Sequence, residues 1–279
     1  TCRYSYADSR SVYVVYQRTK EMIMEYGVLM WMVIPCVAIA FSVIASVSAF
    51  FDWRKTTLSF AVMVPQLLFA LIVWQWILTQ KPPLATMSDT RLWYSFFASL
   101  AGLFTYLRWR YKWIVSYSTV LTSVFLLLRM LKPELSVDPL VPALQSPWFI
   151  PHVTVYMFSY SLLGCAFLIG TVGLFRKSES LLDSADTLVY IGLAFLTFGM
   201  LSGAIWAKSA WGHFWSWDAK ETWALITWLV YLLYIHMRIY HKGSTRLLCI
   251  LLIFAFACLQ MCWWGINFLP SAADSVHVY

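Results

Sequence analysis

The feature that most constrains this chain is a series of long apolar runs that are almost free of charge. Each run is near the length that crosses about 30 Å of hydrocarbon. In a bilayer every backbone N–H and C=O must bond within the protein, so such runs fold as helices. The sequence therefore predicts an all-α, polytopic integral membrane bundle of about eight transmembrane helices. The runs cover residues 27–51, 57–79, 92–107, 113–130, 152–175, 187–206, 222–240 and 247–269.

Composition supports this fold class and excludes others. Hydrophobic residues make up 61% of the chain and charged residues 12%, whereas soluble domains carry about 25% charged residues. The net charge of +7 could suggest a nucleic-acid-binding protein. The basic residues instead lie in short loops between apolar runs, where they set topology. We therefore expect no nucleic-acid partner.

The distribution of lysine and arginine among the loops predicts the orientation. The loops after the first, third, fifth and seventh runs carry more of these residues than the alternate loops, and we assign them to the cytoplasm. This assignment leaves out residues 1–26, which we interpret as an extramembrane tail that could be the end of an upstream region. Residues 27–279 are treated as one transmembrane domain, with both termini outside.

The outer segment 206–223 contains the largest group of residues that could bind a ligand. It is expected to form an external amphipathic loop with five tryptophans, whose rings offer flat apolar surface suited to stacking on a porphyrin. The alternative is an interfacial amphipathic segment without a ligand. Three outer cations could pair with haem propionates: Arg91, Lys208 and Lys220.

Two outer histidines could supply axial ligands to haem iron. His152 begins the fifth run and His277 lies in the tail after the eighth. The alternative is that both are interfacial histidines without a ligand. His236 lies inside the seventh run and is either an inner haem ligand or an interfacial residue near Arg238. His213, inside the Trp-rich segment, is left unassigned.

The start of the seventh run carries a helix-start signal. Asp218 precedes the run and Glu221 follows three residues later, which predicts a capping box. The Asp218 carboxylate could also orient a tryptophan N–H or a haem ligand. The cap is the role that we favour.

These residues resemble a known family. WGHFWSWDAKETWALITWLVYLLYIHMR at 211–238 is similar to the WWD domain of CcsA/ResC-type cytochrome c biogenesis proteins of system II. Three further stretches agree: PPLATMSDTRLWYSFF at 82–97, LVPALQSPWFIPHVTVYMFSYSLLG at 140–164 and WWGINFLPSAADSVHVY at 263–279. The resemblance covers most of residues 82–279 and is specific.

The resemblance implies a haem-handling transmembrane domain over 27–279, with its WWD segment at 206–223. It implies that haem b is carried to the outer face and joined to the CxxCH motif of apocytochrome c. The chain would act in a holocytochrome c synthase, or haem lyase, with a CcsB/ResB-like membrane partner. We expect the bacterial inner membrane, with a periplasmic or extracellular active face, rather than the thylakoid.

The family's functional residues transfer to matching positions. They place external haem ligands at His152 and His277, the transmembrane histidine at His236, and the haem platform at Trp211, Gly212, Trp215, Trp217 and Asp218. Two alternatives stay open: a haem exporter that delivers haem to a separate chaperone, and a membrane b-type cytochrome. The chain has no CxxCH of its own, so it is not a c-type cytochrome.

Overall fold

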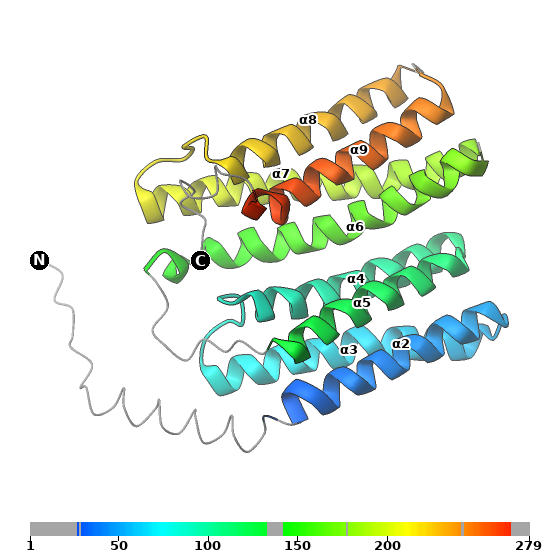
Figure 1. Ribbon diagram of the computed structural model, residues 1–279, viewed down its shortest axis with the longest axis horizontal. Helices are drawn as coiled ribbons and strands as arrows, with labels where there is room; N and C mark the ends of the chain where they lie inside the picture. Colours follow the sequence, from blue (N-terminus) through cyan, green and yellow to red (C-terminus); the bar gives the residue numbers. More distant parts are fainter. Residues whose placement is uncertain (1–26, 28, 133–141, 177, 241–242, 269–279) are drawn as a thin grey trace, which may run out of the picture. The chain divides into compact units, whose positions relative to one another are not determined.

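The fold is a set of long helices (Figure 1). The computed structural model describes residues 27, 29–132, 142–176, 178–240 and 243–268, and no strand occurs among them. The α-helices are α2 (Ile34–Phe50), α3 (Arg54–Thr79), α4 (Met87–Trp109), α5 (Lys112–Leu131), α6 (Phe149–Arg176), α7 (Glu179–Trp211), α8 (Ala219–Ile239) and α9 (Thr245–Trp263). Three short helical turns complete the list: η1 (Leu29–Val33), η2 (Pro142–Gln145) and η3 (Gly265–Phe268). The predicted tail over 1–26 and His277 lie outside the described residues.

The all-α prediction is confirmed, and each predicted run corresponds to one long helix. Within the described residues, seven helical segments are long and apolar enough to cross a membrane. Helix α4 is not one of them, because its polar and aromatic residues lower its hydropathy. Several predicted ends were wrong by a few residues: α7 continues to Trp211 and α9 stops at Trp263.

The described residues form two compact units. Unit 1 contains α2, α3, α4 up to Ser99 and α5 from Thr119. Its core includes Arg129, which is fully buried within α5 and donates to the Gln75 side chain at 2.9 Å. Gln75 in turn donates to Asp89 at 2.7 Å. Buried charges need such partners, so this relay ties α3, α4 and α5 together.

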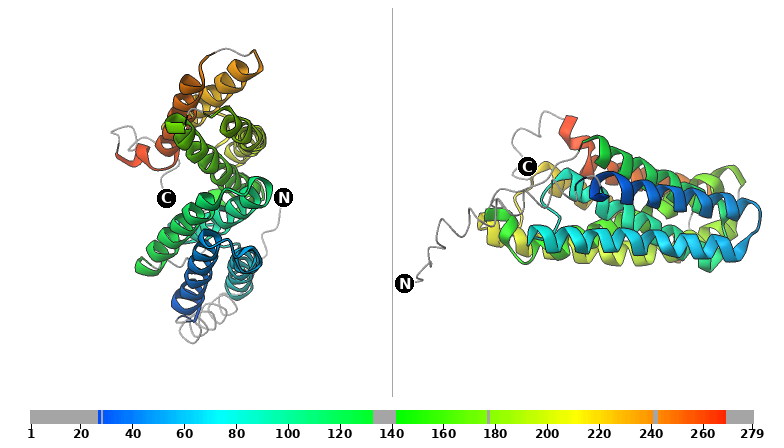
Figure 2. Two further views of the ribbon diagram at one scale, coloured as in Figure 1. Left: turned by 90° about the vertical axis from the view of Figure 1, so that its right-hand side faces the viewer. Right: turned by 90° about the horizontal axis from the view of Figure 1, so that it is seen from below.

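Unit 2 contains residues 100–118 and 141–279, and thus the helices that carry the predicted site. Helix α6 packs against α7 and α9, and α8 packs against α9 and α7. These four helices run alongside one another (Figures 1 and 2). Two of these helices can approach each other closely where a glycine of one faces a side chain of the other, as Gly170 of α6 faces Leu252 of α9.

The two ends of unit 2 differ in composition. At one end α6 begins, α7 ends and α8 begins; we call it the Trp-rich end (Figure 1). At the other end lie Glu179, which starts α7, and Arg238, near the last residue of α8; we call it the charged end.

Candidate functional site

His152 is the best-defined candidate ligand, and it lies in the first turn of α6. Its Nδ1 is 2.9 Å from the carbonyl oxygen of Gly199 on α7. A carbonyl only accepts, so Nδ1 carries the proton and, in the neutral ring, Nε2 carries the lone pair. Metal-binding histidines are commonly held this way, with the second ring nitrogen donating to a carbonyl or carboxylate. This hydrogen bond therefore leaves Nε2 as the ring nitrogen that carries the lone pair.

Two glycines of α7 provide space for the side chains of α6. A Cβ added at Gly203 would lie 2.5 Å from both Cε1 and Nδ1 of His152. A Cβ at Gly199 would lie 3.2 Å from the ring of Tyr156, which itself meets the imidazole edge to face at 4.8 Å. Helix α7 thus forms a recess that fits the imidazole and would not accept a larger residue at 203.

Sequence reasoning missed this recess, although a signal was present. Gly199 and Gly203 are four residues apart within an apolar run, which is the GxxxG spacing typical of closely packed membrane helices. The spacing indicates close approach of a neighbour. It does not indicate that the neighbour is a histidine from the start of another helix.

Trp206 completes the surroundings of His152. Its ring stacks on the imidazole with centroids 5.3 Å apart and planes at 28°. The indole is fully buried, and its Nε1 donates to the carbonyl of Ala143 at 2.7 Å. Trp211 packs against it edge to face at 4.8 Å. The face of the imidazole is therefore covered by a ring that is itself anchored.

The prediction that 206–223 forms one external loop was wrong. Residues up to Trp211 belong to α7, residues 212–218 form the connection, and α8 begins at Ala219. The helix extends past the apolar run because residues 207–210, Ala-Lys-Ser-Ala, tolerate or favour helix. It ends at Gly212, whose φ of +87° suits glycine.

The predicted capping box at Asp218 is confirmed. Its side chain accepts from the N–H groups of Lys220 and Glu221 at 2.8 and 3.0 Å. The Glu221 carboxylate accepts in return from the N–H of Asp218 at 3.3 Å and from that of Ser216 at 2.7 Å. These bonds hold the backbone on both sides of Trp217, whose φ of +61° is uncommon for a bulky residue.

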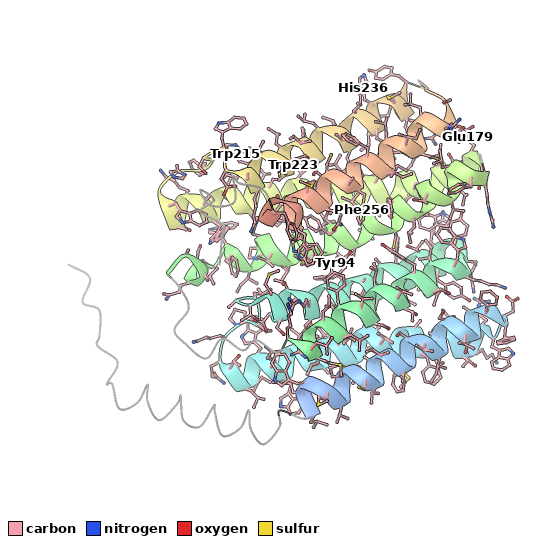
Figure 3. The ribbon with its side chains drawn as sticks, in the orientation of Figure 1. Tyr94, Glu179, Trp215, Trp223, His236 and Phe256 are labelled. Atoms are coloured by element: carbon pink, nitrogen blue, oxygen red, sulfur yellow. The ribbon has the colours of Figure 1, made fainter. Side chains whose placement is uncertain are left out.

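Trp215 and Trp217 differ in their surroundings within this connection. The Trp217 side chain is 69% exposed, and the two rings meet edge to face at 5.9 Å. Among the described residues, the buried Nε1 of Trp215 has no hydrogen-bond partner. Figure 3 shows Trp215 close to the start of α8. An indole N–H in this state can serve an acceptor from a ligand.

Cys262 of α9 connects α6 to the start of α8. It accepts from the Tyr160 hydroxyl at 3.7 Å and donates to the Lys220 carbonyl at 3.4 Å. Tyr160 lies beside Tyr156, with ring centroids 5.6 Å apart. A continuous set of contacts therefore runs from His152 to the capped turn of α8.

The three predicted propionate contacts have different positions. Lys208 is exposed, and its Nζ donates to the Gly212 carbonyl at 2.7 Å, which closes the end of α7. Lys220 lies in the first turn of α8. Arg91 belongs to unit 1, where its guanidinium lies 3.5 Å from the carbonyls of Leu128 and Lys132. Their role toward haem stays a prediction.

The remaining predicted histidines lie apart from this recess or outside the described residues. His236 is exposed on α8, toward the end opposite Trp215 and Trp223 (Figure 3), and contacts the ring of Tyr240 at 4.5 Å. His213 is exposed in the connection after α7. His277 lies outside the residues that the structure describes. Within the described part of the chain, no cluster of three or more His, Cys, Asp or Glu residues could hold a bare metal ion.

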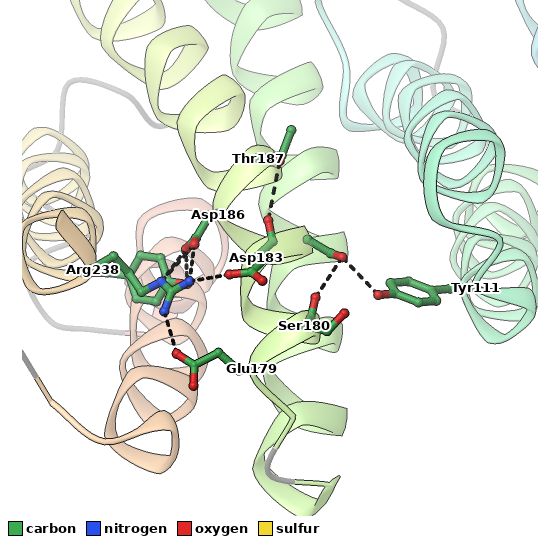
Figure 4. A network of polar contacts seen from close by, with 9 residues as sticks. Tyr111, Glu179, Ser180, Asp183, Asp186, Thr187 and Arg238 are labelled. Carbon is green, nitrogen blue, oxygen red and sulfur yellow. Dashed lines mark hydrogen bonds and ion pairs between the residues drawn. The ribbon is translucent and has the colours of Figure 1, made fainter. Parts of the chain in front are cut away.

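The charged end carries a different network (Figure 4). The Arg238 guanidinium bonds both carboxylate oxygens of Asp186, at 2.6 to 3.0 Å. It also reaches Asp183 at 2.8 Å and Glu179 at 3.4 Å. The Tyr234 hydroxyl donates to Asp186 at 2.6 Å. Sequence reasoning had paired none of these residues, because their partners lie on a different helix.

Comparison with known proteins assigns the family. Residues 64–273 match the family described as Cytochrome C assembly protein. Cytochrome c biogenesis protein CcsA of Trieres chinensis is 31% identical over 280 residues, covering 81% of this chain and 89% of that protein. CcsA of Chlamydomonas reinhardtii is 37% identical over 179 residues, covering 60% of this chain and 50% of that protein. The chain thus spans about half the length of the Chlamydomonas relative.

A solved structure shares the fold. The cytochrome c heme lyase CcmF superposes with a TM-score of 0.68 at 15% identity, over 88% of this chain and 48% of that protein. At this identity the similarity concerns the fold alone. The family match and the extent of the CcsA alignments carry the assignment. The chain belongs to the cytochrome c assembly protein family and is a member of the CcsA type.

Proposed function

We propose that this chain holds haem b at the Trp-rich end of unit 2 and presents it for covalent attachment to apocytochrome c. The observation that carries the proposal is the His152 imidazole, whose Nδ1 donates to Gly199 and whose Nε2 has the lone pair. Membership of the cytochrome c assembly family supports a role in cytochrome c maturation. In this proposal His277 is the second axial ligand, and haem is cargo and substrate.

The Trp-rich end of unit 2 suits a flat apolar ligand. Trp211, Trp215 and Trp217 offer aromatic surface, while Gly212 and the Asp218 cap fix the connection that bears them. The Trp215 N–H, which has no partner among the described residues, suits a propionate oxygen. Lys208 and Lys220 of this unit are the cations proposed to contribute charge to the propionates.

The attachment reaction needs positioning more than acid–base chemistry. Each CxxCH thiol adds across one vinyl group: a C–S bond forms, the π bond breaks, and the thiol hydrogen ends on the other vinyl carbon. The addition involves no net oxidation. The apocytochrome's own histidine then displaces one protein histidine from iron, which weakens retention and permits release. Holding the thiols and the vinyl groups close together in the correct orientation supplies much of the rate of thioether formation.

The arrangement of histidines favours this role over a membrane b-type cytochrome. Such a cytochrome needs two histidines facing one haem within the helices. Here His152 and His236 lie toward opposite ends of unit 2, and His236 is exposed. We propose His236 as a contact for haem entering from the inner side. We further propose a CcsB/ResB-like partner, and a bacterial inner membrane location with an outer active face.

Co-expression with a CcsB-like partner and a CxxCH apocytochrome tests the function. Covalent haem is read by peroxidase staining after denaturing electrophoresis. We expect staining with the wild-type chain, none with His152→Ala or His277→Ala, and partial recovery with added imidazole. His213→Ala serves as the matched control and should stain like the wild type.

Two results would overturn the proposal. Staining in cells that lack this chain would remove the lyase role. Haem that passes to the outer side without any thioether product would favour an exporter. Unchanged haem content and activity in His236→Ala would remove His236 from the path.

A further inference from the structure

We propose that Gly199, Gly203 and Trp206 of α7 form a built support that fixes the tautomer, position and plane of the His152 imidazole. The support thereby sets how strongly His152 binds haem iron. The inference rests on the proposed function, since it concerns the same ligand. The three residues act through His152 and are positioning residues; none of them is proposed to touch iron.

The hydrogen bond from His152 to Gly199 is the first part of the support. Its acceptor is a main-chain carbonyl within α7, so no side-chain rotation can withdraw it. Donation from Nδ1 raises the electron density at Nε2 and strengthens the bond to a metal. A carbonyl acceptor also keeps the proton on Nδ1 and thus leaves Nε2 as the ligating atom.

The space at Gly203 is the second part. The imidazole occupies the volume that a side chain at 203 would need, because a Cβ there would approach Cε1 and Nδ1 to 2.5 Å. Contacts of this length force one partner to move. Since Trp206 covers one face of the ring and Tyr156 meets its edge, the imidazole cannot move without breaking its bond to Gly199.

The stacked indole is the third part. Trp206 lies within 28° of the imidazole plane and is anchored by its own bond to Ala143. This contact fixes the rotation of the histidine about its Cβ–Cγ bond. Residues that surround an axial ligand are among the means by which a protein tunes haem iron, through burial and through hydrogen bonds to that ligand.

Gly192 provides a matched contrast on the same helix. A Cβ there would approach Leu163 Cδ2 to 2.7 Å, a separation similar to that at Gly203. The obstructing atoms are Cδ2 and Cγ of Leu163, at 2.7 and 2.8 Å, and this buried leucine is not a proposed ligand. An alanine at 192 therefore disturbs the packing of α6 against α7 without touching His152, whereas an alanine at 203 must displace the His152 imidazole.

The test compares four full-length chains in detergent: wild type, Gly203→Ala, Gly192→Ala and His152→Ala. Each is titrated with ferric haem b, and affinity, low-spin absorption spectrum and midpoint potential are measured. We expect Gly203→Ala to lower affinity by about 10- to 100-fold and to lose the low-spin spectrum, as His152→Ala does. Gly192→Ala should resemble the wild type in all three readouts.

The outcomes separate this inference from the proposed function. If His152→Ala alters the spectrum and Gly203→Ala does not, the support is wrong and the ligand assignment stands. If His152→Ala changes nothing, the ligand assignment itself fails. Equal losses in Gly203→Ala and Gly192→Ala would show that general helix packing explains the effect.

A second pair of variants removes the risk that Gly203→Ala does not fold. His152→Gly leaves a cavity that added imidazole can fill, and the methyl group of Gly203→Ala fits within that cavity without a clash. In the double variant we expect the imidazole concentration that restores half of the low-spin spectrum to rise by about tenfold or more over His152→Gly. Equal concentrations would overturn the proposed support.

Discussion

At the Trp-rich end of unit 2, helices α6 and α7 meet through an imidazole, two glycines and a buried indole. At the charged end, α7 and α8 meet through Arg238, three carboxylates and a tyrosine hydroxyl. In the first case both hydrogen-bond acceptors are main-chain carbonyls. In the second they are ionised side chains. The helices are thus held together by hydrogen bonds to main-chain carbonyls at one end of unit 2 and by ion pairs at the other.

The contrast fits the proposed function. A ligand-binding imidazole must keep its lone pair directed at a metal, so its partner should be fixed and uncharged. The opposite end of the bundle has no such demand and can use ion pairs, which gain strength where they are shielded from water. We therefore expect the charged end to contribute mainly stability and the Trp-rich end to contribute mainly ligand geometry.

Arg238→Met should give the largest loss of stability. Arg238 and Asp186 side chains are only 13% and 14% exposed, so the change leaves a shielded carboxylate without its cation. Breaking such a pair costs about 3 kcal/mol, measurable by unfolding in detergent. Arg176→Met at the exposed end of α6 is the control and should cost little. Haem spectra should be unchanged in both variants. A spectral change in Arg238→Met would contradict the expectation that the charged end contributes mainly stability.

Trp206→Phe should have the next largest effect. The phenyl ring retains much of the stacking area but cannot donate to Ala143, whose partly buried carbonyl then loses this bond. We expect a loss of about 2 kcal/mol in stability together with a shifted haem midpoint potential. Trp223→Phe in α8 is a matched control. If Trp206→Phe loses stability but leaves the haem midpoint potential unchanged, Trp206 has only a structural role.

Much of this molecule could be predicted from local pattern. The apolar runs predicted the helices, because a bilayer leaves the backbone few alternatives. Asp218 and Glu221 predicted their capping box, because both partners lie within four residues of one another. His152 was placed at the start of its helix, and only the exact boundary was wrong.

The relations between helices could not be predicted in the same way. The Gly199 carbonyl carries no residue-specific signal, so its bond to His152 was not foreseen. Trp206 was counted with an external loop, yet it is buried, because burial depends on which helix covers it. His236 was left open between an inner haem ligand and an interfacial residue; it is exposed on α8, and helical spacing alone does not indicate which face meets a neighbour.

Asp218→Ala tests how far the cap of α8 contributes to the Trp-rich end. The alanine cannot accept from the N–H groups of Lys220 and Glu221, and such losses cost about 1 kcal/mol. Asp218→Asn keeps an acceptor and should restore most of the stability. If haem attachment follows stability in both variants, the carboxylate acts as a cap. If Asp218→Asn is stable but inactive, its charge has a direct role.

Asp183→Asn should give the smallest effect and sharpens the contrast within the charged end. Asp183 also bonds Arg238, but its side chain is 68% exposed, so water screens the pair. Exposed pairs of this kind contribute about 0.5 kcal/mol, and the difference from wild type should vanish in high salt. Arg238 keeps both oxygens of Asp186 in this variant. A loss as large as that of Arg238→Met would mean that the network acts as one unit, and that exposure does not rank its members.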